Sequence, residues 1–267
     1  MPRPVPVRVV AAAAGMAAAT AAFAALATLG AGVAPAGAAS TPSKSASSEY
    51  NAALAAAKDK SVHFVSVVNE GGVTLHVTGD AGNTSGQQTL TVQNGKTTEH
   101  MTAEIVGSNG YVNGNSNALH NVIGLGTSAS NKYAGKWLSF PTSNSGLAQL
   151  VAGLLKAQVD GELGLDSPYS YGADATVNGQ QAVAIKGQVS TSSGGKVSEV
   201  LYVPATGKPL PIEEVTNPGS TSKSSIHGSV SFSNWGENAP VKAPAHSTSL
   251  LKLAPASSSG ATTTTGG

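Results

Sequence analysis

Serine and lysine side chains could form a nucleophilic pair, and two S-x-x-K patterns occur in the chain. They are Ser193-Gly-Gly-Lys196 and Ser220-Thr-Ser-Lys223. In hydrolases with this pattern a nearby base activates the serine, and the serine then attacks the substrate. Both copies lie in turn-like, serine-rich sequence instead of at a helix start, and there is no G-x-S-x-G elbow. We therefore predict no enzyme activity, and a hydrolase using Ser193 or Ser220 is the third-ranked alternative.

Histidine and carboxylate side chains could bind a metal, but their spacing does not favour it. The six histidines are scattered, with no H-x-x-x-H pair and no carboxylate at ligand spacing, and cysteine is absent. His76 alternates with apolar strand residues, so we expect it to face away from them. Glu213 and Glu214 are strand neighbours that point to opposite faces, so they cannot act on one bond. We interpret them as ordinary strand-end charges.

Nucleotides and nucleic acids are also poor candidates as ligands. Gly124-Leu-Gly-Thr-Ser-Ala129 resembles a dinucleotide-binding turn, but no acidic residue occurs between Glu104 and Asp160. We predict a flexible loop there. Both arginines, Arg3 and Arg8, lie in the first eight residues, and the formal net charge is +1. The rest of the chain thus lacks the guanidinium fork suited to phosphate and guanine. We predict no cofactor, no metal and no nucleic acid.

The first 39 residues have the pattern of an export signal. A basic start is followed by an alanine-rich apolar run over residues 9–33 and by Ala36-Gly37-Ala38. We predict cleavage after Ala38 or Ala39 and an extracytoplasmic protein, secreted or associated with the cell envelope. The alternative is an uncleaved membrane anchor, because the apolar run approaches the ~20 residues that span a bilayer.

The elements that must position any site begin after a linker predicted over residues 40–48. Residues 49–60 favour a helix, and from Ser61 apolar residues alternate as in strands. Asn-Gly, a hairpin signal, occurs at Asn94, Asn109, Asn113 and Asn178. Strands are predicted again over 175–177, 181–185, 196–203, 210–215 and 226–232. From His246 the Ser/Thr/Gly-rich tail (246–267) is predicted to be disordered.

One amphipathic helix is predicted between the two groups of strands, over Ser145–Val159. Its apolar stripe must be covered, and one face of an antiparallel sheet is the available partner. The stripe could line a lipid pocket or fill a core, and beside it Trp137 could contact a ligand or anchor a strand. The candidate ligand-binding residues are Leu147, Leu150, Val151, Leu154, Leu155 and Trp137. The order of elements predicts an α+β fold, a large curved antiparallel sheet wrapped around helices as a half-open barrel.

Several segments, taken in order over residues 49–244, resemble one family. They include Ser108-Asn-Gly-Tyr-Val112, Gly135-Lys-Trp137, Leu201-Tyr-Val-Pro-Ala-Thr-Gly-Lys-Pro209 and Val230-Ser-Phe-Ser-Asn-Trp-Gly-Glu237. The chain resembles the LppX/LprG-type envelope lipoproteins of actinobacteria, relatives of the Lol-system lipoprotein carriers. The resemblance implies a half-open sheet around helices that holds acyl chains, and a non-catalytic carrier of lipids or glycolipids over residues 49–245. The family's lipobox cysteine is absent, which excludes a lipid anchor of that kind.

We therefore expect an extracytoplasmic, monomeric binding or carrier protein for a lipid or lipid-linked amphiphile. Binding would come from burial of acyl chains, at ~0.8 kcal/mol per CH₂ group. Contact with a membrane is compatible with this role. The alternative is an envelope protein-interaction or stress-sensing module of the same fold, whose ligand is a partner protein.

Overall fold

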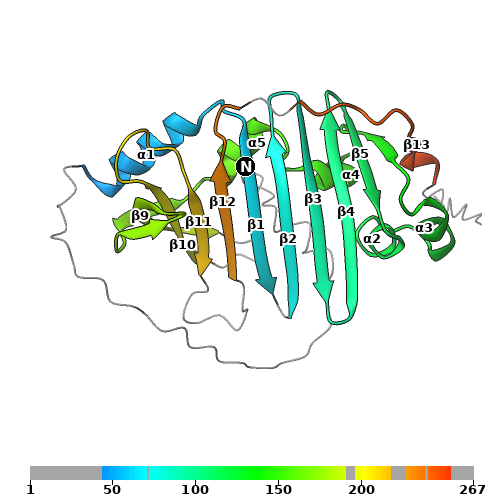
Figure 1. Cartoon of the computed structure of the whole chain (residues 1–267), viewed down its shortest axis with the longest axis horizontal. Helices are drawn as coiled ribbons and strands as arrows, with labels where there is room; N and C mark the ends of the chain where they lie inside the picture. Colours follow the sequence, from blue (N-terminus) through cyan, green and yellow to red (C-terminus); the bar gives the residue numbers. More distant parts are fainter. Residues whose placement is uncertain (1–43, 71, 191–195, 218–226, 238–239, 254–267) are drawn as a thin grey trace, which may run out of the picture.

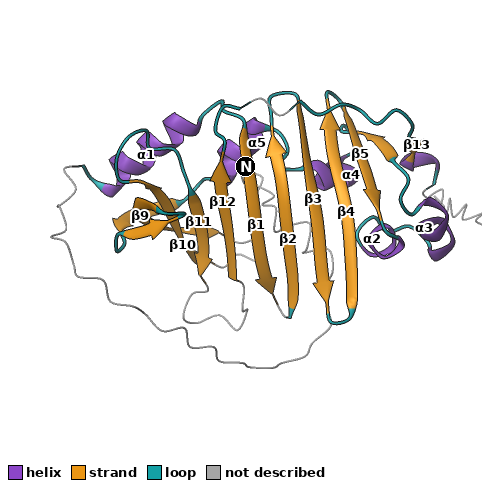
Figure 2. Cartoon of the chain, viewed as in Figure 1, coloured by secondary structure: helices purple, strands orange, loops and turns teal. Residues whose placement is uncertain are grey.

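The computed structural model describes the chain except for residues 1–43, 71, 191–195, 218–226, 238–239 and 254–267. The predicted export signal, the start of the linker and both serines of the S-x-x-K patterns lie outside the described residues. The described strands form one thirteen-stranded sheet in the order β13-β6-β5-β4-β3-β2-β1-β12-β11-β10-β9-β7, with β8 paired to β9. Figure 2 shows this sheet with α1 at one end and α2 and α3 at the other.

The strands pair antiparallel except for β13, which runs parallel to β6. Strands β1 to β6 cover Val62–Glu70, Val73–Ala81, Ser85–Asn94, Thr97–Val106, Asn109–Gly114 and Leu138–Pro141. Strands β7 to β13 cover Asp166–Tyr171, Ala175–Val177, Gln180–Ser190, Lys196–Pro204, Glu213–Asn217, His227–Ser233 and Thr248–Ser249. The ends of the path, β13 and β7, do not pair, so the sheet is open. The predicted open antiparallel sheet is confirmed.

Two of the four Asn-Gly dipeptides form the predicted hairpin turns. Gly95 has φ 58° between β3 and β4, and Asn178 and Gly179 have φ 52° and 78° between β8 and β9. Asn109-Gly110 and Asn113-Gly114 instead lie within β5. The prediction of a turn was wrong at those two positions. The turn between β4 and β5 forms two residues before Asn109, at Gly107 with φ 60°, and the chain continues as a strand through Asn113.

The two faces of the sheet differ in polarity. The inner face, defined by the side chains of Phe64, Leu75, Leu90 and Met101, is buried. On the outer face His76 and Thr78 of β2 are exposed, whereas Leu75 and Val77, which alternate with them, are buried, as the alternation predicts. His76 therefore faces away from the apolar residues, which confirms the prediction.

Helix α1 (Ala46–Ala57) contacts β7 and β9 at one end of the sheet (Figure 1). It begins at Ala46, within the stretch predicted to be a linker, because the Ser45 side chain accepts a hydrogen bond from the Ser48 N–H. Its buried side chains are Ala46, Tyr50, Ala53 and Ala57. Helices α2 (Ser116–Asn121) and α3 (Thr127–Tyr133) form the other end.

The single helix predicted over Ser145–Val159 is wrong. The chain forms α4 (Ser145–Ala148) and the short 3₁₀ helix η2 (Gln149–Val151), and then α5 (Lys156–Glu162) after an extended stretch. Gly153 has φ 79°, a left-handed conformation that ends the helical run. The extended stretch bridges to the sheet, since the Gly82 N–H donates to Leu154 O and the Lys156 N–H donates to Gly82 O.

The tail predicted to be disordered from His246 is ordered over residues 246–253, and the rest of the predicted tail lies outside the described residues. The ordered part forms β13 and the 3₁₀ helix η3 (Leu250–Lys252). The backbone N–H of Thr248 donates to Trp137 O at 3.0 Å, and Leu250 is buried. A polar tail was expected to lack a core contact, but Leu250 supplies one. None of the described helices combines the length and apolar character that crossing a membrane requires.

Candidate functional site: a pocket between α1 and the end of α5

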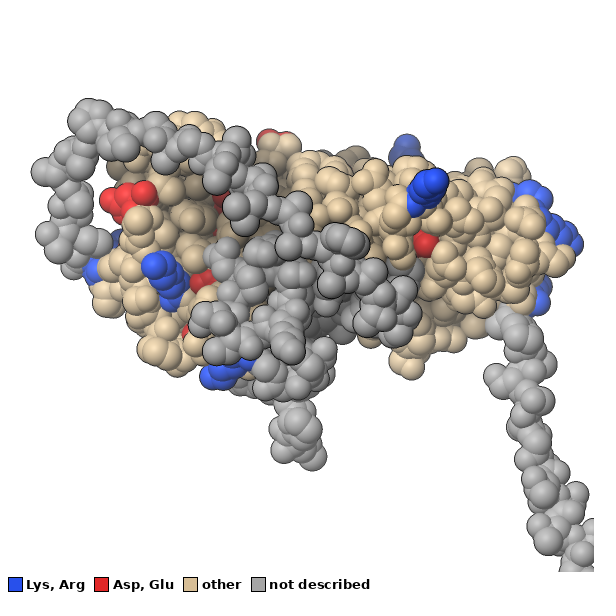
Figure 3. All heavy atoms as spheres, turned by 90° about the horizontal axis from the view of Figure 1, so that it is seen from below, with Lys and Arg blue, Asp and Glu red and all other residues tan. Residues whose placement is uncertain are grey.

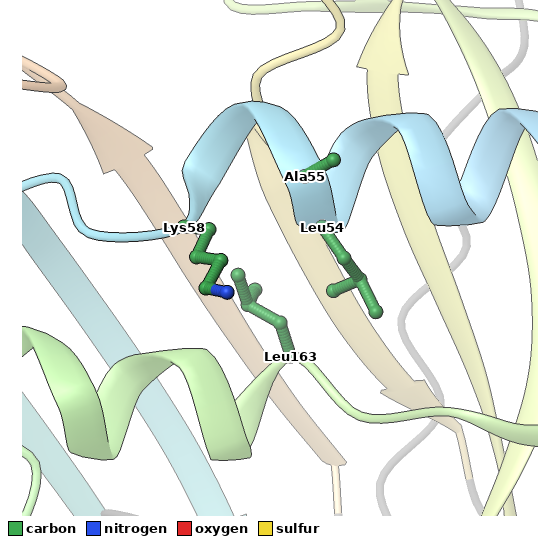
Figure 4. A pocket seen from close by; sticks show the side chains of 4 residues that line it. All are labelled: Leu54, Ala55, Lys58 and Leu163. Carbon is green, nitrogen blue, oxygen red and sulfur yellow. The ribbon is translucent and has the colours of Figure 1, made fainter.

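A pocket of about 250 Å³ lies between helix α1 and the end of α5. It is lined by Leu54 and Ala55 of α1, by Lys58 at the C-terminal end of this helix and by Leu163 (Figure 4). Figure 4 shows the side chains of Leu54 and Lys58 extending from α1 towards Leu163. Half-buried Leu54 supplies the accessible apolar wall, Leu163 lies almost fully buried at its base, and the Lys58 ammonium supplies a positive charge beside them. The arrangement suits one short apolar chain with a polar or anionic group at its end.

Helical spacing places Leu54, Ala55 and Lys58 on one side of the helix. Positions 54, 55 and 58 are neighbours on the helix surface, whereas Tyr50, Ala53 and Ala57 lie on the side buried against the sheet. Sequence reasoning noted Leu54 as part of a helix but did not identify the pocket residues. The available signal was Lys58 at four residues from Leu54, a weak one because exposed lysines are common on helices.

Tyr50 connects α1 to the segment that carries Leu163. Its hydroxyl donates a hydrogen bond to Leu163 O at 3.0 Å and accepts one from the Leu165 N–H at 2.6 Å. The Tyr50 ring also stacks on Tyr169, with centroids 4.6 Å apart. Burial raises the pKa of Tyr50 to about 12. The neutral hydroxyl therefore fixes the position of Leu163 relative to α1.

Two carboxylates lie on the inner face of the sheet, where their negative charge adds to the effect of burial in raising the pKa of Tyr50. Glu199 of β10 and Glu214 of β11 are 1% and 8% exposed. Glu199 Oε1 accepts a hydrogen bond from Thr216 Oγ1 at 2.8 Å. Glu213 and Glu214 do point to opposite faces, but Glu214 was wrongly interpreted as an ordinary strand-end charge. The antiparallel register places it opposite Leu201, inside the molecule.

Other buried polar atoms interrupt the apolar inner face. The Ser66 hydroxyl and Gln88 Oε1 have no hydrogen-bond partner among the described residues. Glu99 is 3% exposed and accepts a hydrogen bond from Asn121 Nδ2 of α2 through one carboxylate oxygen. Sequence analysis did not single out these residues. Alternation within β1, β3 and β4 places each of them on the apolar side of its strand, which is the signal that could have found them.

The six residues predicted to bind a ligand do not line the described pocket. Leu150, Val151 and Leu154 are buried in the hydrophobic core, and Leu147 and Leu155 pack against it. Trp137 is half-buried just before β6, where its carbonyl accepts the hydrogen bond from Thr248. None of the six is among the residues that line the pocket next to α1. Their role in binding a ligand stays a prediction.

The remaining motifs form no further site among the described residues. Gly124–Gly126 is a turn between α2 and α3, with a helix and not a strand before it, so it lacks the βαβ setting of a dinucleotide site. His63 Nδ1 lies 2.7 Å from Asp80 Oδ1 on the outer face. No group of three or more His, Asp or Glu side chains that could hold a metal ion occurs in the part of the chain that the structure describes.

Comparisons with known proteins show likeness only at the level of structure. No protein-family model matches the sequence, and no curated protein matches it significantly. LprF from Mycobacterium bovis is 16% identical, with a TM-score of 0.47, over 74% of this chain and 95% of that one. The Mycobacterium tuberculosis lipoprotein LppX is 14% identical, with a TM-score of 0.45, over 74% of this chain and 98% of that one. At these values the likeness identifies no ligand or activity.

Proposed function

We propose that the protein is an extracytoplasmic binding or carrier protein for a lipid or lipid-linked amphiphile, and that it catalyses no reaction. The observation that carries the proposal is the pocket between Leu54 and Leu163 with Lys58 beside it. An acyl chain placed there would contact mainly Leu54, and an anionic headgroup would meet the Lys58 ammonium. Several sequence segments, taken in their order along the chain, resemble LppX/LprG-type lipoproteins, and this resemblance supports the same role.

The size of the pocket limits what it holds in this form. At about 250 Å³ it is smaller than the roughly 300–1,000 Å³ typical of pockets that enclose a whole small molecule. We therefore propose that it receives the end of one apolar chain. Each CH₂ group that the pocket fully buries would contribute ~0.8 kcal/mol.

Native mass spectrometry of the protein purified from its own host tests the proposal directly. We expect a bound amphiphile of constant mass that organic solvent removes. A protein that is free of ligand, or that retains one partner protein stoichiometrically in its place, would contradict the proposal and favour an interaction module.

Substitutions on α1 then locate the binding site. Ala55→Trp should fill the pocket and abolish binding of a fluorescent fatty acid, whereas Ser48→Trp, on exposed surface of the same helix, should leave it unchanged. Lys58→Gln should weaken binding of the anionic probe more than binding of its neutral alcohol. Equal affinity in all three variants would place the ligand elsewhere.

A further inference from the structure

One end of the molecule carries exposed lysines without exposed acidic partners. Lys132 of α3, Lys136 just after it and Lys252 of η3 are all exposed. Figure 3 shows basic side chains at this end of the molecule, whereas at the other end basic and acidic side chains are visible together. We call the surface formed by these three lysines with Tyr133 and Leu251 the α3–η3 end.

Two of the lysines are held at one aromatic ring. The ammonium groups of Lys132 and Lys136 lie 5.4 Å and 5.7 Å from the centroid of the Tyr133 ring. Tyr133 is half-buried and packs against the hydrophobic core. Cation–π attraction of this kind orients a lysine weakly and leaves its ammonium hydrated. Both charges therefore remain available to a partner.

The third lysine follows an exposed leucine. Helix η3 is fixed to the sheet, because β13 pairs with β6 and Leu250 is buried. Leu251, the next residue, is 47% exposed, and Lys252 follows it. A large apolar side chain is thus presented to solvent between a buried anchor and a positive charge.

Acidic residues are absent from the surrounding sequence. None occurs between Glu104 and Asp160, and none after Glu237, so β5, α2, α3, β6, β13 and η3 carry no negative side chain. The nearest acids in the chain lie on β4. Glu99 is buried, and Glu104 is half-buried with one oxygen inaccessible to solvent. The exposed charged side chains of the α3–η3 end are therefore basic.

We propose that the α3–η3 end docks on an anionic lipid bilayer. Flexible lysines attract anionic headgroups, an exposed leucine can enter the acyl boundary, and a half-buried tyrosine suits the interface between them. This combination fits a membrane surface better than a protein, whose interfaces favour arginine over lysine. The proposal goes beyond ligand binding by the pocket, because docking requires no bound ligand and uses different residues.

Co-sedimentation of the purified protein with lipid vesicles tests the proposal. We expect it to bind phosphatidylcholine vesicles containing about 30 mol% phosphatidylglycerol and not vesicles of phosphatidylcholine alone. Each lysine should contribute about fivefold to the partition coefficient, so K132Q/K136Q/K252Q should reduce it about 100-fold. Leu251→Ser should reduce partition further, and the reduction should persist at high salt.

A matched control separates this surface from net charge. K186Q/K196Q/K208Q removes the same number of exposed lysines from β9, β10 and the turn after β10. It should bind anionic vesicles like the unmodified protein. Equal losses in the two triple variants, or no binding to anionic vesicles, would overturn the proposal. So would vesicle binding that a soluble acidic polysaccharide abolishes and that Leu251→Ser does not affect, since it would indicate a polyanion site.

Discussion

At the scale of single residues, the Tyr50 hydroxyl is the group that joins α1 to the segment carrying Leu163. It satisfies the Leu163 carbonyl and the Leu165 N–H, and both of these residues are buried. Tyr50→Phe should lower the free energy of unfolding by about 1–3 kcal/mol, because it leaves two buried backbone groups without a partner. Tyr171→Phe is the control, since that hydroxyl bonds Lys44 O in an exposed position, and its loss should cost less.

The raised pKa of Tyr50 also predicts a pH dependence. Its ordinary value is 10.0 and burial raises it to about 12, so the folded state retains the proton over a range where the unfolded state has lost it. The contribution of Tyr50 is complete below pH 10.0 and is lost as the pH rises through about 12. Urea denaturation from pH 9 to pH 12 should show a decrease in stability that is smaller in Tyr50→Phe. Parallel curves for the two proteins would contradict this origin.

Residue types alone revealed some of these roles and not others. His76 could be placed on the outer face because two-residue alternation fixes the direction of a strand side chain. Glu214 could be placed opposite to Glu213 by the same rule, but whether its face was inside or outside depended on the pairing with Leu201 of β10. In the sequence Lys58 resembles any exposed helix lysine. Only the fold shows that it lines a pocket with Leu163, about a hundred residues later in the chain.

At the scale of elements, the close passage of residues 152–155 over the sheet depends on Gly86. A Cβ atom at this position would meet Leu154 O, and it would lie 2.7 Å from Asp80 O. Gly86→Ala should therefore force the backbone apart and lower the unfolding free energy by about 2 kcal/mol or more. Gly126→Ala is the matched control, since nothing lies within 4 Å of its added carbon. Equal midpoints of denaturation for the two variants would contradict the close contact.

Helix η3 supports a second comparison, between adjacent leucines. Leu250 is 3% exposed and Leu251 is 47% exposed. Leu250→Ala should lower the unfolding free energy by about 2–5 kcal/mol, whereas Leu251→Ala should change it by less than about 0.5 kcal/mol. Thermal or urea denaturation measures both. A small effect of Leu250→Ala would mean that η3 contributes little to the fold.

Most strands could be predicted from sequence, whereas the helical segment after β6 could not. Period-two alternation and two Asn-Gly turns located the hairpins because strands and turns depend on local residues. The apolar stripe over Ser145–Val159 fits a helix, but hydrogen bonds from Gly82 to Leu154 and from Lys156 to Gly82 compete with it. Gly153 was the local sign that a helix ends there. The extended conformation of the residues after it depends on Gly82, about 70 residues earlier in the chain.

At the scale of the whole molecule, two meanders join at one ladder. Strands β2 to β6 extend from one side of β1, and β12, β11, β10, β9 and β7 extend from the other. The junction pairs β1 with β12 from His63 opposite Ser233 to Asn69 opposite His227, about 160 residues apart in the chain. Local patterns predicted strands on both sides of the junction, but a contact of such sequence separation has no local signal.

The junction predicts how the molecule unfolds. Phe64 of β1 pairs with Phe232 of β12, and both side chains are buried. Because β1 also pairs with β2, loss of the junction should expose apolar residues on both sides of it, and the two halves should unfold together.

The two tryptophans offer a test, since Trp137 precedes β6 and Trp235 follows β12. W235F leaves Trp137 as the only tryptophan, and W137F leaves Trp235. In each variant the fluorescence transition in urea should coincide with the far-UV circular dichroism transition of the same sample. Adding Phe64→Ala should move both transitions to lower urea by an equivalent of about 3–5 kcal/mol. If the Trp235 transition moved while the Trp137 transition stayed, the halves would be separate folding units. The open sheet would then consist of two domains in contact. A ligand bound next to α1 would stabilise its own domain against unfolding and would not stabilise the α3–η3 end.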